Sequence, residues 1–203
     1  MRFSKLGALM VMVLVYSCGD GAGHHLAIQS EKTIRPMQKV EAKSLTLRPQ
    51  EGLIFHQGKP FTGTSQAFYP DRSLAEAITY VNGKKHGTRQ KWFPHGSLSY
   101  TSTYVLGKLH GEAKSWWSSG FLRSISRFER GVAHGLQEQW YPTGARFKEI
   151  NLVQGREEGM QRAWRKNGKI YNNYEAKNGR IFGLKRASLC FELDAEEIQY
   201  ANR

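Results

Sequence analysis

The amino-acid sequence predicts an all-β protein: an elongated single antiparallel sheet, or solenoid, of stacked 24-residue β-hairpin repeats. Three observations support this prediction. Glycines recur at one fixed interval, a tryptophan recurs at the same interval, and each interval contains two turn signals separated by short runs of strand-forming residues. A fixed period between roughly 20 and 50 residues is the signature of a repeat architecture, in which each unit buries its apolar face against its neighbours.

The N-terminal segment, residues 1–17, is predicted to be a lipoprotein signal peptide. Arg2 and Lys5 stand ahead of an apolar run at positions 6–15, which is too short to span a bilayer and suits a secretory signal. The run ends in VYSC, which resembles the lipobox of bacterial lipoproteins, and this resemblance implies lipidation of Cys18. The alternative is an ordinary cleaved signal followed by an incidental cysteine.

The next segment, residues 18–50, is rich in Gln, Lys, Glu, Ser and Pro and shows little periodicity. It is interpreted as a tether followed by a strand that leads into the repeats. The repeat array is assigned to residues 51–186. It starts with a loose copy, which holds Gly58-Lys59 and Gly63 and is offset by one residue from the strict period.

Four columns of equivalent residues keep the 24-residue period within the array. Two of them belong to the hexapeptides NGKKHG, LGKLHG and RGVAHG and to their later counterparts. The first glycine column is Gly83, Gly107, Gly131, Gly155 and Gly179, and the second is Gly87, Gly111, Gly135, Gly159 and Gly183. The remaining columns are Trp92, Trp116, Trp140 and Trp164, and Gly96, Gly120, Gly144 and Gly168. Because all columns share one period, each is expected to occupy one structural position.

Each unit contains two turn signals. The segments FPHGS, WSSGF, YPTGA and RKNGK combine glycine with other turn-forming residues, which predicts turns. The runs between the turns, such as TRQKWF and SLSYTSTYV, are rich in aromatic and β-branched residues and have the length of strands. One unit is therefore predicted to be a β-hairpin. The hexapeptide is interpreted as the turn that leads into the next hairpin, because paired glycines allow positive φ at such corners.

The last segment, residues 187–203, is predicted to be a capping strand with an acidic tail. The motif SLCFELD alternates in a strand-like way and could pair with the last hairpin, which would cover an open sheet edge. The acidic residues of the following DAEE would discourage the addition of further strands.

The positive charge of the chain is concentrated in the array. Thirty Lys and Arg residues oppose seventeen Asp and Glu residues, which gives a formal net charge of +13. Between Gly83 and Arg186 there are twenty basic and seven acidic residues, so the flanking segments sum to zero. The natural partners of such a field are anions.

The repeat pattern resembles the MORN repeat in its bacterial variant form. The resemblance covers about residues 55–185 and rests on aromatic-x-x-Gly-Lys-x-His-Gly, a Trp five residues later, and Gly-x-Leu. It implies hairpins stacked in an elongated, twisted antiparallel sheet that serves as a platform for protein or lipid contact. In the last units Glu158 and Phe182 replace His, and Arg146 replaces Leu, which is expected of capping repeats.

Two columns invite functional interpretations that the repeat geometry disfavours. The Trp column could stack sugars or bases, but one large aromatic per repeat is also what a thin sheet needs for a core. His86, His110 and His134 could suggest a metal site. Equivalent side chains two strands apart are about 10 Å from each other, whereas the nitrogens of two zinc ligands lie roughly 3 Å apart. We therefore expect no metal and no other cofactor, and a structural role for the Trp column.

The candidate residues for binding a partner are the cations that follow the first glycine of each corner. They are Lys59, Lys84, Lys108, Arg156 and Arg180, with Val132 in the third strict unit. We expect them on one edge, about 10 Å apart, so that a surface of repeated negative charge could meet several at once. Anionic lipid headgroups, lipopolysaccharide or an acidic polymer would fit, and a polybasic patch commonly supports a lipid anchor. The alternative is that a turn position simply favours a solvated polar residue.

Signatures of catalysis are missing from the sequence. It contains no G-x-S-x-G, H-E-x-x-H, P-loop or C-x-x-C motif, and the glutamates of the array are scattered over different repeat positions. The sequence therefore predicts a non-enzymatic protein with no catalytic residues.

The predicted function is that of a membrane-tethered repeat lipoprotein, a binding or scaffold module at the bacterial cell envelope with an unidentified protein partner. An alternative follows from the resemblance, because bacterial relatives include YwqK-type antitoxins. An exported chain would meet only an exported toxin, so an immunity-like role would remain. A third alternative, nucleic-acid binding, suits the basic charge and the interleaved aromatic residues but also fails if the chain is exported.

Overall fold

The computed structural model of the chain describes residues 38–185. The predicted signal peptide, Cys18 and the predicted capping strand lie outside this range. In chain order the elements are β1 (Lys39–Glu41), the 3-10 helix η1 (Ala42–Ser44), β2 (Thr46–Arg48), β3 (Leu53–His56), β4 (Lys59–Pro60), β5 (Gly63–Phe68), β6 (Leu74–Val81), β7 (Lys84–Trp92), β8 (Leu98–Val105), β9 (Lys108–Trp116), β10 (Leu122–Glu129), β11 (Val132–Ala133), β12 (Gly135–Trp140), β13 (Arg146–Val153), β14 (Arg156–Trp164), β15 (Ile170–Lys177) and β16 (Arg180–Leu184).

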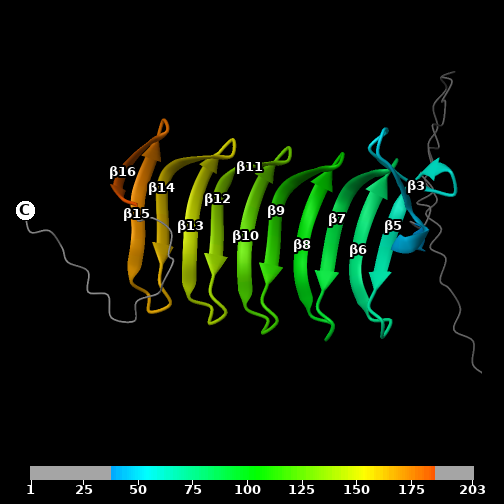
Figure 1. Cartoon of the computed structure of the whole chain (residues 1–203), viewed down its shortest axis with the longest axis horizontal. Coiled ribbons are helices and arrows are strands. Elements are labelled where there is room, and N and C mark those ends of the chain that lie inside the picture. Colours follow the sequence, from blue (N-terminus) through cyan, green and yellow to red (C-terminus); the bar gives the residue numbers. More distant parts are fainter. Residues whose placement is uncertain (1–37, 186–203) are drawn as a thin grey trace, which may run out of the picture. The chain divides into compact units, whose positions relative to one another are not determined.

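The repeats build one 13-stranded sheet, called here the main sheet. From β5 to β16 neighbouring strands are antiparallel and follow each other across the sheet in chain order, except that the short β11 and β12 both pair with β10 (Figure 1). Each unit thus adds two strands, which confirms the predicted all-β class and the stacked hairpins. No helix within residues 38–185 is long and apolar enough to cross a membrane.

The N-terminal part of the array departs from a single antiparallel sheet. Strand β1 pairs with β5 in parallel, and β2, β3 and β4 form a separate three-stranded sheet, the small sheet. In this loose first copy Gly58 and Gly63 are one residue further apart than Gly83 and Gly87. Strand β4 pairs with β3 and ends at Pro60, before β5 begins at Gly63.

The recurring hexapeptide was expected to be a corner, and the structure corrects its extent. Only its first two residues form the turn: Asn82 and Gly83 have φ of 48° and 76°, and both positions are also positive in later units. Two successive positive φ angles are typical of the type I′ hairpin turn. The remaining four residues belong to the following strand, β7, in which the second glycine, Gly87, has a φ of 85°.

The second glycine column marks a β-bulge in the first, second and fourth strict units, whereas the ladder of β15 with β16, which contains Gly183, has no register shift. Near Gly159 the pairing of β13 with β14 shifts between Ile150 and Leu152. Gln161, 1% exposed, satisfies the backbone there: its Oε1 accepts the Asn151 N–H at 3.0 Å, and its Nε2 donates to the Asn151 carbonyl at 2.9 Å. Such bulges add a residue to one strand, and a buried side-chain amide replaces the lost ladder bonds.

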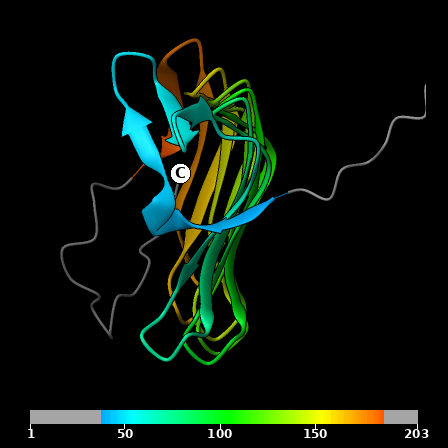
Figure 2. The ribbon, with the colours of Figure 1, turned by 90° about the vertical axis from the view of Figure 1, so that its right-hand side faces the viewer.

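The core lies on one face of the main sheet, called the inner face. Ile78, Ser102 and Ala113 are buried there. Arg89 pairs with both Ile78 and Ser102, and Ser102 pairs with Ala113, so all of them lie on the same face. The small sheet covers this face at its N-terminal end, where Ile54 packs against the cluster that contains Ile78 (Figure 2). The Trp column is only half-buried, because each Trp is the last residue of its strand, so it does not form the core alone.

Aromatic side chains link successive units at the turns that follow the Trp column. The Tyr69 hydroxyl donates to the Trp92 carbonyl at 2.7 Å, and the Tyr141 hydroxyl to the Trp164 carbonyl at 2.8 Å. In the unit directly before that of Tyr141, the equivalent residue Trp117 donates through Nε1 to the Trp140 carbonyl at 3.1 Å. Each bond joins one unit to the next. The strand ends that carry these turns are therefore held together by side chains as well as by the strand ladder.

Candidate functional site

The candidate site lies at the other ends of the strands, away from the turns that follow the Trp column, and is called here the turn edge. It comprises the two-residue turns at 82–83, 106–107, 130–131, 154–155 and 178–179 and the first residue of each following strand. Backbone bonds tie one turn to the preceding unit: the Gly107 N–H donates to the Lys85 carbonyl at 2.7 Å, and Gly131 to Leu109 at 2.7 Å. The edge is therefore a fixed row of turns.

The His column has a structural role on this edge. His86 Nδ1 accepts the Leu106 N–H and His134 Nδ1 accepts the Gln154 N–H, each at 3.5 Å. Glu158 accepts the equivalent N–H of the next turn, that of Asn178, at 3.3 Å. The change from His to Glu158 is thus a replacement of one acceptor by another, and the interpretation as decay toward a cap is wrong at this position.

Metal coordination finds no support in this arrangement. His86 and His134 are each engaged with a separate turn. Within residues 38–185 no group of three or more His, Cys, Asp or Glu side chains is placed to hold a metal ion.

Four of the five candidate cations stand in one row on the turn edge. Lys84, Lys108, Arg156 and Arg180 are the first residues of β7, β9, β14 and β16, and all four are exposed. None of them forms an ion pair within the described part of the chain. The fifth, Lys59, begins β4 and therefore belongs to the small sheet.

Several cations on the two faces of the main sheet are, in contrast, paired with glutamates. Arg89 lies 2.7 Å from Glu76, and Arg127 lies 3.0 Å from Glu138. The hydrogen bond from Lys114, with its positive charge, holds the pKa of the Glu112 carboxyl below its usual value. These glutamates thus offset charges on the faces, whereas the four cations of the row have no ion pair within residues 38–185.

Sequence reasoning missed two features of the turn edge. Arg130 is exposed in the turn before Val132, so the third strict unit also carries a cation at this edge. Leu106 is 67% exposed and occupies a turn position with φ of 48°, where Asn stands in two other units. Leucine is disfavoured in this conformation, and its occurrence next to a type I′ glycine was the available sequence signal.

Comparison with known proteins supports a relation to the MORN family. Residues 85–105 match the family model described as MORN repeat variant. MORN repeats are generally protein- or lipid-binding modules. None of the curated proteins compared with the chain matches it.

Among solved structures, the chain is similar to one described as "Crystal structure of accessory secretory protein 1,2 and 3 in Streptococcus pneumoniae". The identity is 22%, the match covers 51% of this chain and 19% of that chain, and the TM-score is 0.29. The match thus spans about a fifth of the length of that relative, and a TM-score this low supports no inference about fold or function.

Proposed function

We propose that this protein is a non-enzymatic binding module of the bacterial cell envelope, tethered through a lipidated Cys18, whose turn edge contacts an anionic surface. The observation that carries the proposal is the row of exposed cations that have no ion pair within residues 38–185, next to faces on which cations are paired. The match to a repeat of a generally protein- or lipid-binding family supports it.

The spacing of the row suits an extended surface. Lys84 and Lys108 belong to strands two places apart in the main sheet, so they are about 10 Å from each other. Each cation near an anionic membrane contributes about 1 kcal/mol, and the four together would add roughly 4 kcal/mol. A contribution of this size would hold the turn edge against the membrane surface in addition to the lipid anchor.

Exposed apolar side chains favour a lipid surface over a soluble polymer. Val105 and Val153 stand opposite Lys108 and Arg156 in the strand ladder, and both valines are exposed. Leu106 extends this pattern into a turn. Apolar groups next to cations can enter the boundary between headgroups and acyl chains, where both kinds of side chain contribute to binding.

The test is co-sedimentation of the mature chain, with Cys18→Ala to remove acylation, with vesicles of phosphatidylglycerol and phosphatidylcholine at several salt concentrations. The edge variant carries K84Q, K108Q, R156Q and R180Q. The control variant removes the same charge from glutamate-paired cations and carries K91Q, K114Q, R146Q and R162Q. We expect the edge variant to lose affinity on the order of 10²–10³-fold and the control to lose much less. Equal losses, or no binding by the unsubstituted edge, would contradict the proposal.

The tether is tested separately by cell fractionation and intact mass of the wild-type chain and Cys18→Ala. A membrane-bound product with a diacylglyceryl mass that disappears in the variant would support an envelope lipoprotein. A soluble, unprocessed and unmodified wild-type chain would contradict it, and antitoxin or nucleic-acid binding would then be the readings to pursue.

A further inference from the structure

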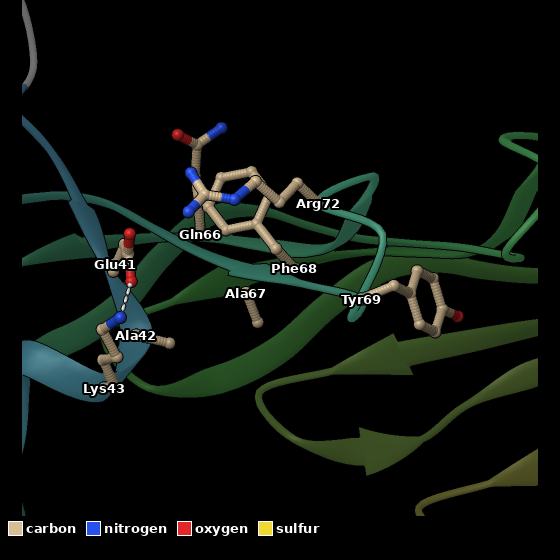
Figure 3. A pocket seen from close by; sticks show the side chains of 8 residues that line it. All are labelled: Glu41, Ala42, Lys43, Gln66, Ala67, Phe68, Tyr69 and Arg72. Carbon is tan, nitrogen blue, oxygen red and sulfur yellow. Dashed lines mark ion pairs between the residues drawn. The ribbon is translucent and has the colours of Figure 1, made fainter.

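A cleft of about 570 Å³ lies beside β5, remote in the chain from the row of cations (Figure 3). Glu41 and Lys43, from β1 and η1, line one part of it, and Gln66, Phe68 and Arg72, from β5 and the turn that follows, line another. Its volume falls in the range of roughly 300–1,000 Å³ that is typical of ligand sites.

The cleft opens where β1 leaves the edge of β5. The last pair of this parallel ladder is Glu41 with Gln66, after which the chain turns into η1 while β5 continues to Phe68. The Thr64 N–H donates across this edge to the Gln38 carbonyl at 2.8 Å. Backbone groups of a strand point to the same side at every second residue, so the N–H and C=O of Phe68 also face the edge. Beyond Glu41, β1 supplies no partner for them, and an extended peptide could pair there.

Arg72 occupies a backbone conformation that the other units give to glycine. Its φ is +67°, and the residues at the same repeat position, which have φ between 81° and 88°, are Gly96, Gly120, Gly144 and Gly168. An arginine in the left-handed region costs conformational energy that glycine avoids. Leu106, Arg130 and Gln154 also have positive φ in turns, so the conformation of Arg72 supports the inference together with the cleft that it lines.

The charges of the cleft favour a carboxylate. Glu41 is already paired with Lys43 at 2.6 Å, whereas Arg72 forms no ion pair within the described residues. The hydrogen bond and the charge of Lys43, with a smaller contribution from Arg72, lower the pKa of Glu41. The planar guanidinium of an unpaired arginine suits a carboxylate in a two-bond geometry.

We infer that this cleft binds the C-terminal end of an extended peptide. The terminal carboxylate pairs with Arg72, the peptide main chain adds to the open edge at Phe68, and an apolar last side chain packs on the Phe68 ring, which is 45% exposed. The ligand class differs from the anionic surface proposed for the turn edge, so either proposal can fail alone.

The test uses the mature chain with Cys18→Ala and a fluorescein-labelled peptide, Ser-Thr-Val-Leu with a free carboxylate, followed by fluorescence anisotropy. The same peptide with a C-terminal amide is the ligand control. We expect the amide to bind at least tenfold more weakly, and ¹⁵N spectra to show a shift of the Phe68 amide with the free acid. Equal affinity for acid and amide, or no binding of the acid at millimolar concentration, would overturn the inference.

Arg72→Gly separates binding from folding. Because glycine relieves the left-handed strain, we expect this variant to have a higher Tm than the wild type and at least a tenfold lower affinity for the free-acid peptide. Lys84→Gln, which removes one positive charge from the turn edge, should bind the peptide as the wild type does. Wild-type affinity in Arg72→Gly, or a lower Tm, would contradict the assigned role of Arg72.

Discussion

At the residue scale, burial on the inner face raises the pKa of the hydroxyl of one tyrosine, Tyr174. Tyr174 is 6% exposed, and its hydroxyl donates to Glu157 Oε2 at 3.0 Å. Lys185 lies over the ring, 5.0 Å from its centroid. Burial raises the pKa of the Tyr174 hydroxyl to about 12, and the hydrogen bond to Glu157 and the charge of its carboxylate add to the effect. The folded protein therefore holds this proton more tightly than the unfolded chain does.

The raised pKa predicts an alkaline loss of stability. An unfolded tyrosine ionises near pH 10, so between pH ~10 and pH 12 the folded state binds more protons, and the free energy of unfolding falls as the pH rises. Tyr174→Phe removes this contribution. We expect its Tm, measured by circular dichroism between pH 8 and 12, to decline less steeply than that of the wild type above pH 10. Parallel declines would show that Tyr174 ionises alike in both states.

At the scale of the element, each hairpin is stabilised by hydrogen bonds to its neighbours at both ends of its strands. Backbone bonds link the turn edge, and side chains of the Tyr69 position link the opposite edge. The first strict unit is the exception, since its equivalent residue is Phe93, which carries no donor. Its ring instead stacks on His95, with 5.4 Å between the ring centroids. The link to the next unit is thus weaker here by one hydrogen bond.

Phe93→Tyr should restore the missing link. By analogy with Tyr69 and Tyr141, the new hydroxyl would donate to the carbonyl of Trp116. A net gain of about 0.5–1.5 kcal/mol would raise the Tm by roughly 2–4 °C per kcal/mol for a chain of this size, measurable by calorimetry. Phe121→Tyr is the matched control, because Phe121 is 53% exposed and stands at another repeat position. Equal effects of both substitutions would mean that no specific bond forms.

At the scale of the whole molecule, a stacked array must manage its two end strands. At the N-terminal end β1 covers part of β5, and the small sheet packs on the inner face. At the other end β16 pairs only with β15 among the described strands, and it exposes Ile181, Phe182 and Leu184. An apolar edge strand of this kind is a template for pairing with another chain. The predicted capping strand, residues 187–203, would follow directly.

Removal of residues 187–203 tests the predicted cap. We expect a chain that ends at Arg186 to self-associate, whereas the full mature chain stays monomeric in sedimentation velocity at the same concentration. Phe182→Lys in the shortened chain should restore the monomer, because a charge on an edge strand disfavours pairing. A monomeric shortened chain without that substitution would contradict the capping role.

The sequence by itself determined the period, the strands and the turns, because these depend on local chemistry that recurs every 24 residues: glycine where φ is positive, β-branched and aromatic residues between turns. It also located four cations of the turn edge, Lys84, Lys108, Arg156 and Arg180. Only the tertiary structure showed which side chain accepts the N–H of each turn, as His86 does for Leu106. It also showed that Gln161 bonds the backbone at a β-bulge and that Lys59 belongs to the small sheet. It also placed Arg72 in a cleft with Glu41 and Lys43. Such contacts join residues some 10 to 31 positions apart, and no local preference encodes them.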